Sequence, residues 1–137
     1  MSLKVLAFGT FDILHPGHLA YLRQASRRAH DLVVVIARDS TVLRIKGRKP
    51  VFSERDRQKI VASLRWVSRA VLGDPIDHMK IVLKERPDII CLGYDQRISR
   101  KDLRKRLIGL GLKNVQVLRL PPYQRTLYKS SRFRKIT

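Results

Sequence analysis

The sequence has few acidic residues, few aromatic residues, a single cysteine and no long apolar run, and each shortage narrows what the chain can be. Cys91 has no second cysteine to pair with, so an internal disulfide is excluded, which favours a reducing, cytoplasmic location. No stretch approaches the roughly 18 apolar residues that a membrane span requires, so we expect no membrane contact. Aromatic residues form only 7% of the chain, which disfavours a nucleic-acid-binding module that stacks bases.

Basic residues are abundant by comparison. The chain has 30 Lys and Arg against 11 Asp and Glu, a formal net charge of +19. Residues 97–137 hold 13 of these basic residues and one acid, Asp102. Such a surface attracts the phosphates of nucleotides, nucleic acids or acidic cosubstrates. We interpret most of it as a solvated basic surface, and nucleic-acid binding stays open as an alternative of another functional class.

The order of apolar segments predicts the fold class. A chain of 137 residues is typical of one domain, here residues 1–137. Segments typical of buried strands alternate with segments of helical periodicity. The expected strands are 3–8, 32–37, 70–72, 89–92 and 115–118, and the expected helices are 16–29, 53–67, 76–84, 102–110 and one after Lys129. We therefore expect an α/β fold, a Rossmann-like doubly wound parallel sheet of about five strands with helices on both faces.

The loops that follow the strands are the expected place for a ligand. In such a sheet the ligand crevice lies beyond the carboxyl ends of the strands, where the strand order reverses. The loops after Phe8, Ala37 and Leu92 should therefore face one another. These loops hold the unusual residues of the sequence.

The segment 9–18 (GTFDILHPGH) links the first expected strand to the first expected helix, with Pro16 at a favoured first helical position. His15 and His18 are three residues apart, so both project from one side of a starting helical turn. The positive end of the helix dipole and its unpaired N–H groups bind phosphate oxygens, and Gly17 lets a phosphate approach closely. Two imidazoles beside a triphosphate donate hydrogen bonds to the charge that develops during transfer.

The two histidines have simpler interpretations as a surface pair or as metal ligands. No acidic or cysteine residues at metal-site spacing accompany them, so we expect no metal held by the protein itself. Phosphoryl-type transfer depends mainly on positioning and electrostatics, so no covalent nucleophile is needed. We expect Gly9 to permit the tight turn from strand to helix, and Asp12 to brace that turn rather than move protons.

These residues resemble a known family. GTFDILHPGH is similar to the HxGH signature of the cytidylyltransferase-like superfamily of nucleotidyltransferases. The resemblance continues in ARDSTV (37–42), KGRKP (46–50), the segment 53–60 and GYDQ (93–96). Together these segments look most like the archaeal FAD synthases, although related cytidylyltransferases have similar segments at the later positions.

The resemblance implies roles by position. His15, His18 and Lys46 would form the catalytic set, in which Lys46 neutralises the triphosphate or the acceptor phosphate. Lys46 is otherwise one more solvated lysine in a mobile basic segment. Lys49 and Arg57 would contact the nucleotide or the acceptor. The expected nucleotide-binding positions in this part of the chain are Gly9, Thr10, Phe11, His15, Gly17, His18 and Asp95.

The end of the chain departs from the family pattern. Related cytidylyltransferases carry an RTxGxSTT-like segment that binds the triphosphate, whereas residues 125–132 read RTLYKSSR and place Tyr128 at the glycine position. The change favours a nucleotide other than CTP. Tyr123 would pack on the base or be a plain loop aromatic. The further nucleotide contacts expected here are Arg125, Ser130 and Ser131.

The resemblance implies the transfer of AMP from ATP to FMN, giving FAD and pyrophosphate. A divalent cation, Mg²⁺, would bridge the triphosphate oxygens and be held largely by substrate and water. ATP and FMN are the expected substrates, and a homodimer is the expected assembly. The alternative enzyme is a cytidylyltransferase that acts on glycerol 3-phosphate or a related phosphate ester.

Overall fold

Five strands form one parallel sheet in the order β3-β2-β1-β4-β5. The computed structural model describes residues 3–93 and 98–121, to which the statements below refer. The strands are β1 (Lys4–Gly9), β2 (Asp31–Ile36), β3 (Arg69–Leu72), β4 (Ile89–Leu92) and β5 (Gln116–Arg119). The chain first winds from β1 towards β3 and then returns to the other side of β1, so the strand order reverses between β1 and β4.

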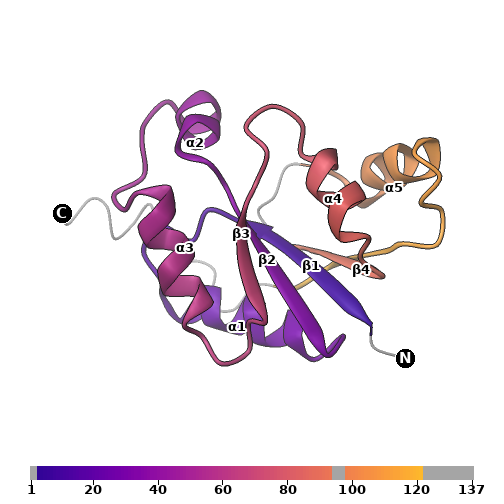
Figure 1. Ribbon diagram of the computed structural model, residues 1–137, viewed down its shortest axis with the longest axis horizontal. Coiled ribbons are helices and arrows are strands. Elements are labelled where there is room, and N and C mark those ends of the chain that lie inside the picture. The colour runs from indigo at the N-terminus through magenta and orange to yellow at the C-terminus, as the bar shows by residue number, and fades with distance from the viewer. Residues whose placement is uncertain (1–2, 94–97, 122–137) are drawn as a thin grey trace.

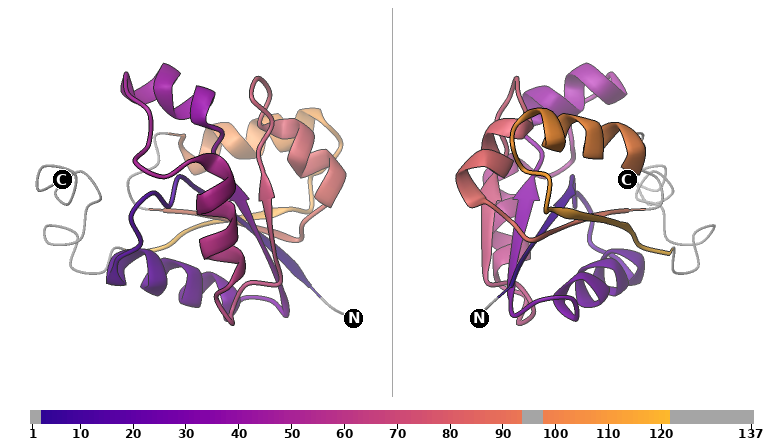
Figure 2. Two further views of the ribbon diagram at one scale, coloured as in Figure 1. Left: turned by 60° about the vertical axis from the view of Figure 1, so that its left-hand side comes forward. Right: turned by 90° about the vertical axis from the view of Figure 1, so that its right-hand side faces the viewer.

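Helices cover both faces of this sheet (Figure 1). The helices are α1 (Pro16–Ser26), α2 (Asp39–Lys46), α3 (Glu54–Ala62), α4 (Met79–Glu85) and α5 (Arg100–Gly109). Helices α1 and α3 pack on one face and α4 and α5 on the other, while α2 lies beyond the carboxyl ends of the strands (Figure 2). The fold is therefore the predicted doubly wound α/β sheet.

The two-sided covering explains why the central strands are apolar without alternation. On β1, Val5 and Ala7 pack into the cluster beneath α1 and α3, whereas Leu6 packs with α4 and α5. On β2, Val34 belongs to the first cluster and Val33 to the second. A strand buried on both faces has no solvent side for polar residues.

The predicted strands are confirmed, with ends that differ by at most one residue, but α2 was not predicted. The helix buries only Thr41 and Val42, so it has no apolar stripe that the periodicity of the sequence could reveal. Gly47, at φ 77°, ends the helix in the left-handed conformation that glycine tolerates. The helix expected after Lys129 lies outside the described residues.

A charged cluster ties three elements together at the amino end of the sheet. Glu85, at the end of α4, accepts hydrogen bonds from Arg69 of β3 and from Lys4 of β1, the latter at 3.3 Å. The hydrogen bonds from Arg69, with that from Lys4, lower the pKa of Glu85 against the opposing effect of burial. Because the folded protein holds this carboxylate ionised, the cluster stabilises the fold above the ordinary glutamate pKa and loses that effect as pH falls.

We predict that Glu85→Gln lowers the free energy of unfolding by about 1–2 kcal/mol at pH 7, because charge-assisted hydrogen bonds are lost while one amide acceptor remains. Urea unfolding at several pH values measures this effect. The difference from the wild type should shrink below about pH 4, where the unfolded carboxyl is protonated. A pH-independent difference would contradict an ionic role for Glu85.

Candidate active site

The turn after β1 is held by a buried aromatic ring. Phe11 is 3% exposed and has φ 53°, so it makes the sharp change of direction itself. A Cβ atom on Gly9 would lie 2.5 Å from Cε2 of Phe11. Gly9 is therefore required by the close approach of this ring, rather than by the backbone freedom expected from the sequence. The ring also packs edge-on against His18, with a centroid distance of 5.5 Å, and stacks on Tyr21.

His15 is the N-cap of α1. Its Nδ1 accepts a hydrogen bond from the Gly17 N–H at 3.1 Å, and its carbonyl accepts one from the His18 N–H at 2.9 Å. Pro16 is at the first helical position, as predicted, and has no N–H. The expectation of unpaired N–H groups in this turn was thus wrong, because His15 already satisfies them. Since Nδ1 accepts, the neutral imidazole carries its proton on Nε2, where it can be donated to a ligand.

The two histidines of the motif form a stacked pair. Their ring centroids are 3.9 Å apart, with an angle of 21° between the planes. Burial, followed by the electrostatic effects of the neighbouring His15 and of Lys46, lowers the pKa of His18 to about 3. At neutral pH His18 is therefore an uncharged imidazole. The predicted juxtaposition of the two side chains is confirmed.

Asp12 joins this turn to the segment before α3. The side chain is 1% exposed, and its two carboxylate oxygens accept hydrogen bonds from the N–H groups of Val51 and Phe52 at 2.8 and 2.9 Å. The carboxylate therefore fixes the position of one loop relative to the other. The prediction that Asp12 braces the turn is confirmed.

Arg57 of α3 is fully buried beneath the same turn. Its guanidinium donates to the carbonyls of Thr10 and Phe52, at 2.8 and 3.0 Å, and to Oδ1 of Asp39 at 2.7 Å. All three guanidinium nitrogens are thereby occupied. Arg57 therefore contacts the candidate site at the Thr10 carbonyl, through its hydrogen bond. Its direct contact with the nucleotide or the acceptor stays a prediction.

Helices α2 and α3 exchange caps at their first residues. The Asp39 N–H donates to Oε1 of Glu54 at 2.8 Å, and the Glu54 N–H donates to Oδ2 of Asp39 at 3.3 Å. Arg38 adds an ion pair to Glu54 at 2.9 Å. The side chain of Ser53, the N-cap of α3, accepts a hydrogen bond from the Asp56 N–H. The structural role of Glu54 was not predicted, because its partners are remote in sequence.

Lys46 is the last residue of α2, and its charge acts on His18. The expectation that Lys46 lies in a mobile segment is corrected, since it is in the last turn of a helix whose start is fixed by Glu54. The structure thus brings Lys46 together with the histidine pair. Lys49, in the following loop, is exposed.

Two further side chains at the reversal of strand order were not predicted. The Tyr21 hydroxyl of α1 lies within hydrogen-bond distance of two carbonyl oxygens, that of Cys91 at 2.9 Å and that of Phe8 at 3.3 Å. It therefore ties α1 to β4 and β1. Arg119 donates to the carbonyls of Gly93 and Ile98, both at 2.6 Å, and joins the two flanks of the segment 94–97. Tyrosine and arginine carry no positional signal for such contacts in sequence.

The remaining predicted nucleotide contacts lie outside the described residues. They are Asp95, Tyr123, Arg125, Ser130 and Ser131. Within residues 3–93 and 98–121, no group of three or more His, Cys, Asp or Glu side chains is arranged to hold a metal ion. In the same part of the chain no helix is long and apolar enough to cross a bilayer.

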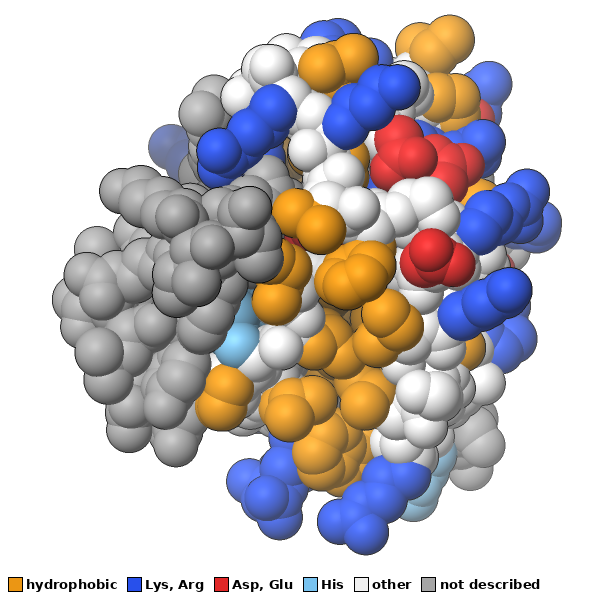
Figure 3. Space-filling model, turned by 90° about the vertical axis from the view of Figure 1, so that its left-hand side faces the viewer, with side chains coloured by type: hydrophobic (Ala, Val, Ile, Leu, Met, Phe, Trp, Pro, Cys, Tyr) orange, Lys and Arg blue, Asp and Glu red, His pale blue; other side chains and the backbone are white. Residues whose placement is uncertain are grey.

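The described surface is basic but mixed. On the face that Figure 3 shows, Lys and Arg side chains lie around a central strip of hydrophobic side chains, with a few acids on one side. The charge is therefore distributed over the rim of this face, as expected for a solvated basic surface.

Known proteins match this chain along most of its length. The model of the cytidylyltransferase-like family matches residues 6–136. An FAD synthase of Thermoplasma acidophilum is 46% identical over 132 residues, which cover 96% of this chain and 92% of that protein. An FAD synthase of Aciduliprofundum boonei is 50% identical over 120 residues, which cover 88% of this chain and 79% of that protein.

Solved structures agree as well. A Thermoplasma volcanium protein described as a lipopolysaccharide core biosynthesis protein is 42% identical, with a TM-score of 0.86 over 90% of this chain and 100% of that one. Pantoate-beta-alanine ligase from Francisella tularensis has a TM-score of 0.69 over 99% of this chain and 66% of that one; at 18% identity it shows the fold alone. With its HxGH turn at the reversal of strand order and a family match along nearly its whole length, the chain belongs to the cytidylyltransferase-like family of nucleotidyltransferases.

Proposed function

We propose that this chain is an FAD synthase, an FMN adenylyltransferase that joins AMP from ATP to FMN and releases pyrophosphate. The observation that carries the reaction class is the stacked His15–His18 pair at the start of α1, beside the charge of Lys46. The choice of acceptor is supported by archaeal FAD synthases that are 37–50% identical over most of this chain.

In the proposed reaction an oxygen of the FMN phosphate attacks the α-phosphorus of ATP. The bond from this phosphorus to the bridging oxygen of the β-phosphate breaks, and pyrophosphate leaves with the electron pair. The attacking phosphate is already ionised at neutral pH, so no general base is required. The residues of the site therefore act by position and charge.

The histidine pair supplies donors in a fixed orientation. Nδ1 of His15 accepts a hydrogen bond from the Gly17 N–H, so the proton on Nε2 can be donated to a phosphate oxygen. His18 is fixed by the ring of Phe11 and donates as a neutral imidazole. Donors held in place before the reaction stabilise developing charge without reorganisation. Lys46 adds the positive charge that the triphosphate or the acceptor phosphate requires.

A bound Mg²⁺ would neutralise the triphosphate and polarise its oxygens. The acids that face the turn already have partners, because Asp12 accepts from Val51 and Phe52 and Asp39 pairs with Arg57. This fits a metal held mainly by substrate and water rather than by a protein cage.

A homodimer, one domain over residues 1–137 and a cytoplasmic location stay predictions.

The second candidate is a cytidylyltransferase that uses glycerol 3-phosphate or a similar ester. It shares the histidine pair and the fold, so only the substrates separate the two. The segment 125–132, with Tyr128 in place of the family glycine, favours ATP. Incubation with ATP or CTP, each with FMN or glycerol 3-phosphate, followed by mass analysis of the product, tests the assignment.

We predict that His15→Asn and His18→Ala each lower kcat about 10²-fold, equivalent to roughly 3 kcal/mol, because each removes a transition-state donor. Asparagine is a good N-cap, so His15→Asn separates the catalytic role of this histidine from its helix-capping role. Steady-state assays with melting temperatures measure both effects. His30→Ala, at an exposed histidine outside the site, is the matched control. Near-normal turnover in either variant would refute the mechanism.

We predict a preference for ATP over CTP of at least about tenfold in kcat/KM, or roughly 1.4 kcal/mol in the transition state. Asp95→Ala should lower kcat/KM for ATP and leave the melting temperature unchanged, because a carboxylate that binds the nucleoside contributes little to the core. Parallel rates with both nucleotides and FMN measure the preference. Faster turnover with CTP, or reaction of glycerol 3-phosphate while FMN is inert, would favour the cytidylyltransferase.

A further inference from the structure

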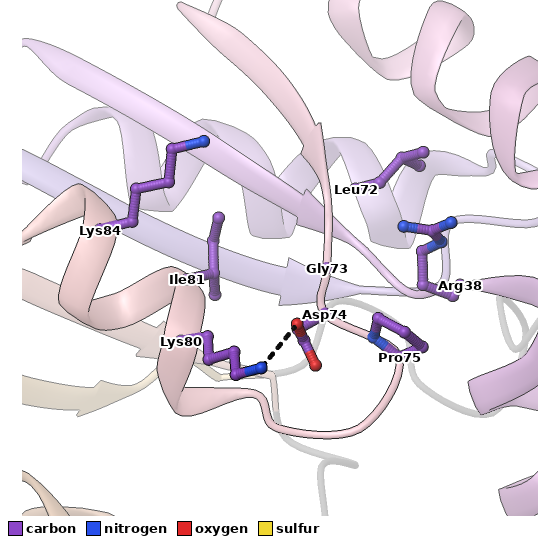
Figure 4. Close-up of a pocket in the computed structure, with 8 residues that line it drawn as sticks. All are labelled: Arg38, Leu72, Gly73, Asp74, Pro75, Lys80, Ile81 and Lys84. Atoms are coloured by element: carbon purple, nitrogen blue, oxygen red, sulfur yellow. Dashed lines mark ion pairs between the residues drawn. The ribbon is translucent and has the colours of Figure 1, made fainter.

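A hollow of about 240 Å³ lies between α4 and the ends of β2 and β3 (Figure 4). Pro75 and Ile81 give it apolar walls, and Arg38, Lys80 and Lys84 contribute three positive charges. This volume is below the roughly 300–1,000 Å³ that encloses a whole drug-sized ligand. The hollow therefore suits one flat ring system rather than a complete nucleotide.

Asp74, the acidic residue that lines this hollow, already has hydrogen-bond and ion-pair partners. Oδ1 of Asp74 accepts from the N–H groups of Ile76 and Asp77, at 2.9 and 2.8 Å, and these bonds lower the pKa of its carboxyl. Lys80 lies 3.9 Å from its other oxygen, as the dashed line in Figure 4 marks. The pocket consequently presents more donors than acceptors to a ligand.

The pocket is connected to the candidate active site. Arg38 lines the pocket and also pairs with Glu54, which caps the start of α2. Arg44 of α2 donates to the carbonyl of Pro75 at 3.1 Å. The helix that ends at Lys46 is therefore attached to the rim of this pocket at both its start and its last turn.

We propose that this pocket binds the isoalloxazine ring of FMN while the FMN phosphate reaches the HxGH turn; the proposal rests on the function proposed above. The apolar walls would contact the ring faces and its dimethylbenzene edge. Lys80 and Lys84 would donate to the two carbonyl oxygens at the opposite edge.

The spacing of the strands fits this placement. Neighbouring strands lie about 4.8 Å apart, so the ends of β1 and β3, which are separated by β2, lie about 10 Å from each other. The bonds of an extended ribityl chain, each about 1.5 Å long, separate the FMN phosphate from the ring by roughly 9 Å. With its phosphate at the end of β1, FMN is therefore long enough for its ring to reach the end of β3, where the pocket lies.

The test compares two double variants that change the net charge equally. Lys80→Gln/Lys84→Glu alters the pocket, and Lys101→Gln/Lys105→Glu alters exposed positions on α5, outside the pocket. We measure KM for FMN, KM for ATP, kcat/KM for ribitol 5-phosphate as an acceptor without the ring, and inhibition by riboflavin, which has the ring but no phosphate. Melting temperatures verify that both proteins fold.

The pocket variant is expected to raise KM for FMN at least fivefold and to weaken riboflavin inhibition by a similar factor. It should leave KM for ATP and the rate with ribitol 5-phosphate within twofold of the wild type, and the α5 variant should change none of these values. An unchanged KM for FMN, an equal effect of the α5 variant, or an equal loss with ribitol 5-phosphate would overturn the proposal. Wild-type protein that makes no FAD from FMN and ATP would instead overturn the proposed function itself.

Discussion

The buried guanidinium of Arg57 is the interaction on which the geometry of the site depends. A cation withdrawn from water is costly unless it is paired and fully hydrogen-bonded. Asp39 supplies the opposite charge at one guanidinium nitrogen, and the carbonyls of Thr10 and Phe52 accept from the other two nitrogens. These partners come from the end of β1, the start of α2 and the loop before α3. The guanidinium therefore joins the three segments, and separating them would leave a buried charge without its partners.

The contacts around this guanidinium extend the same constraint to the chemistry. Asp12 fixes the loop at Val51 and Phe52, and Glu54 fixes the start of α2. Since Lys46 ends that helix, its position relative to His18 is determined by contacts made a helix length away. The Glu85 cluster lies at the opposite end of the sheet. The charged cluster that stabilises the fold and the histidine pair of the site are therefore separated by the length of the strands.

The sequence predicts the parts of this molecule that local rules govern. Strands buried on both faces read as unbroken apolar runs, Pro16 and Ser53 mark helix starts, and histidines three residues apart lie on one side of a turn. The rest depends on contacts between remote residues. Helix α2 is held by Glu54 rather than by an apolar stripe, and the N–H groups of the HxGH turn are satisfied by His15 itself. The pocket beside α4 combines Arg38, the end of β3 with the loop after it, and α4, which no spacing rule connects.

The neutral state of His18 follows from the same crowding that organises the site. Before substrates bind, burial, the neighbouring His15 and the charge of Lys46 oppose protonation of His18 and lower its pKa to about 3. A bound triphosphate reverses the balance, because an anion near an imidazole favours its protonated form and raises its pKa. In the free site the neutral His18 avoids repulsion between two stacked cations whose ring centroids are 3.9 Å apart. When the phosphates bind, the pKa of His18 rises and its hydrogen bonds to them become stronger. As pyrophosphate leaves, negative charge develops beside His18, a hydrogen-bond donor that is already in position. The hydrogen bond from His18 therefore becomes stronger in the transition state than in the complex with bound substrates, which is what catalysis requires.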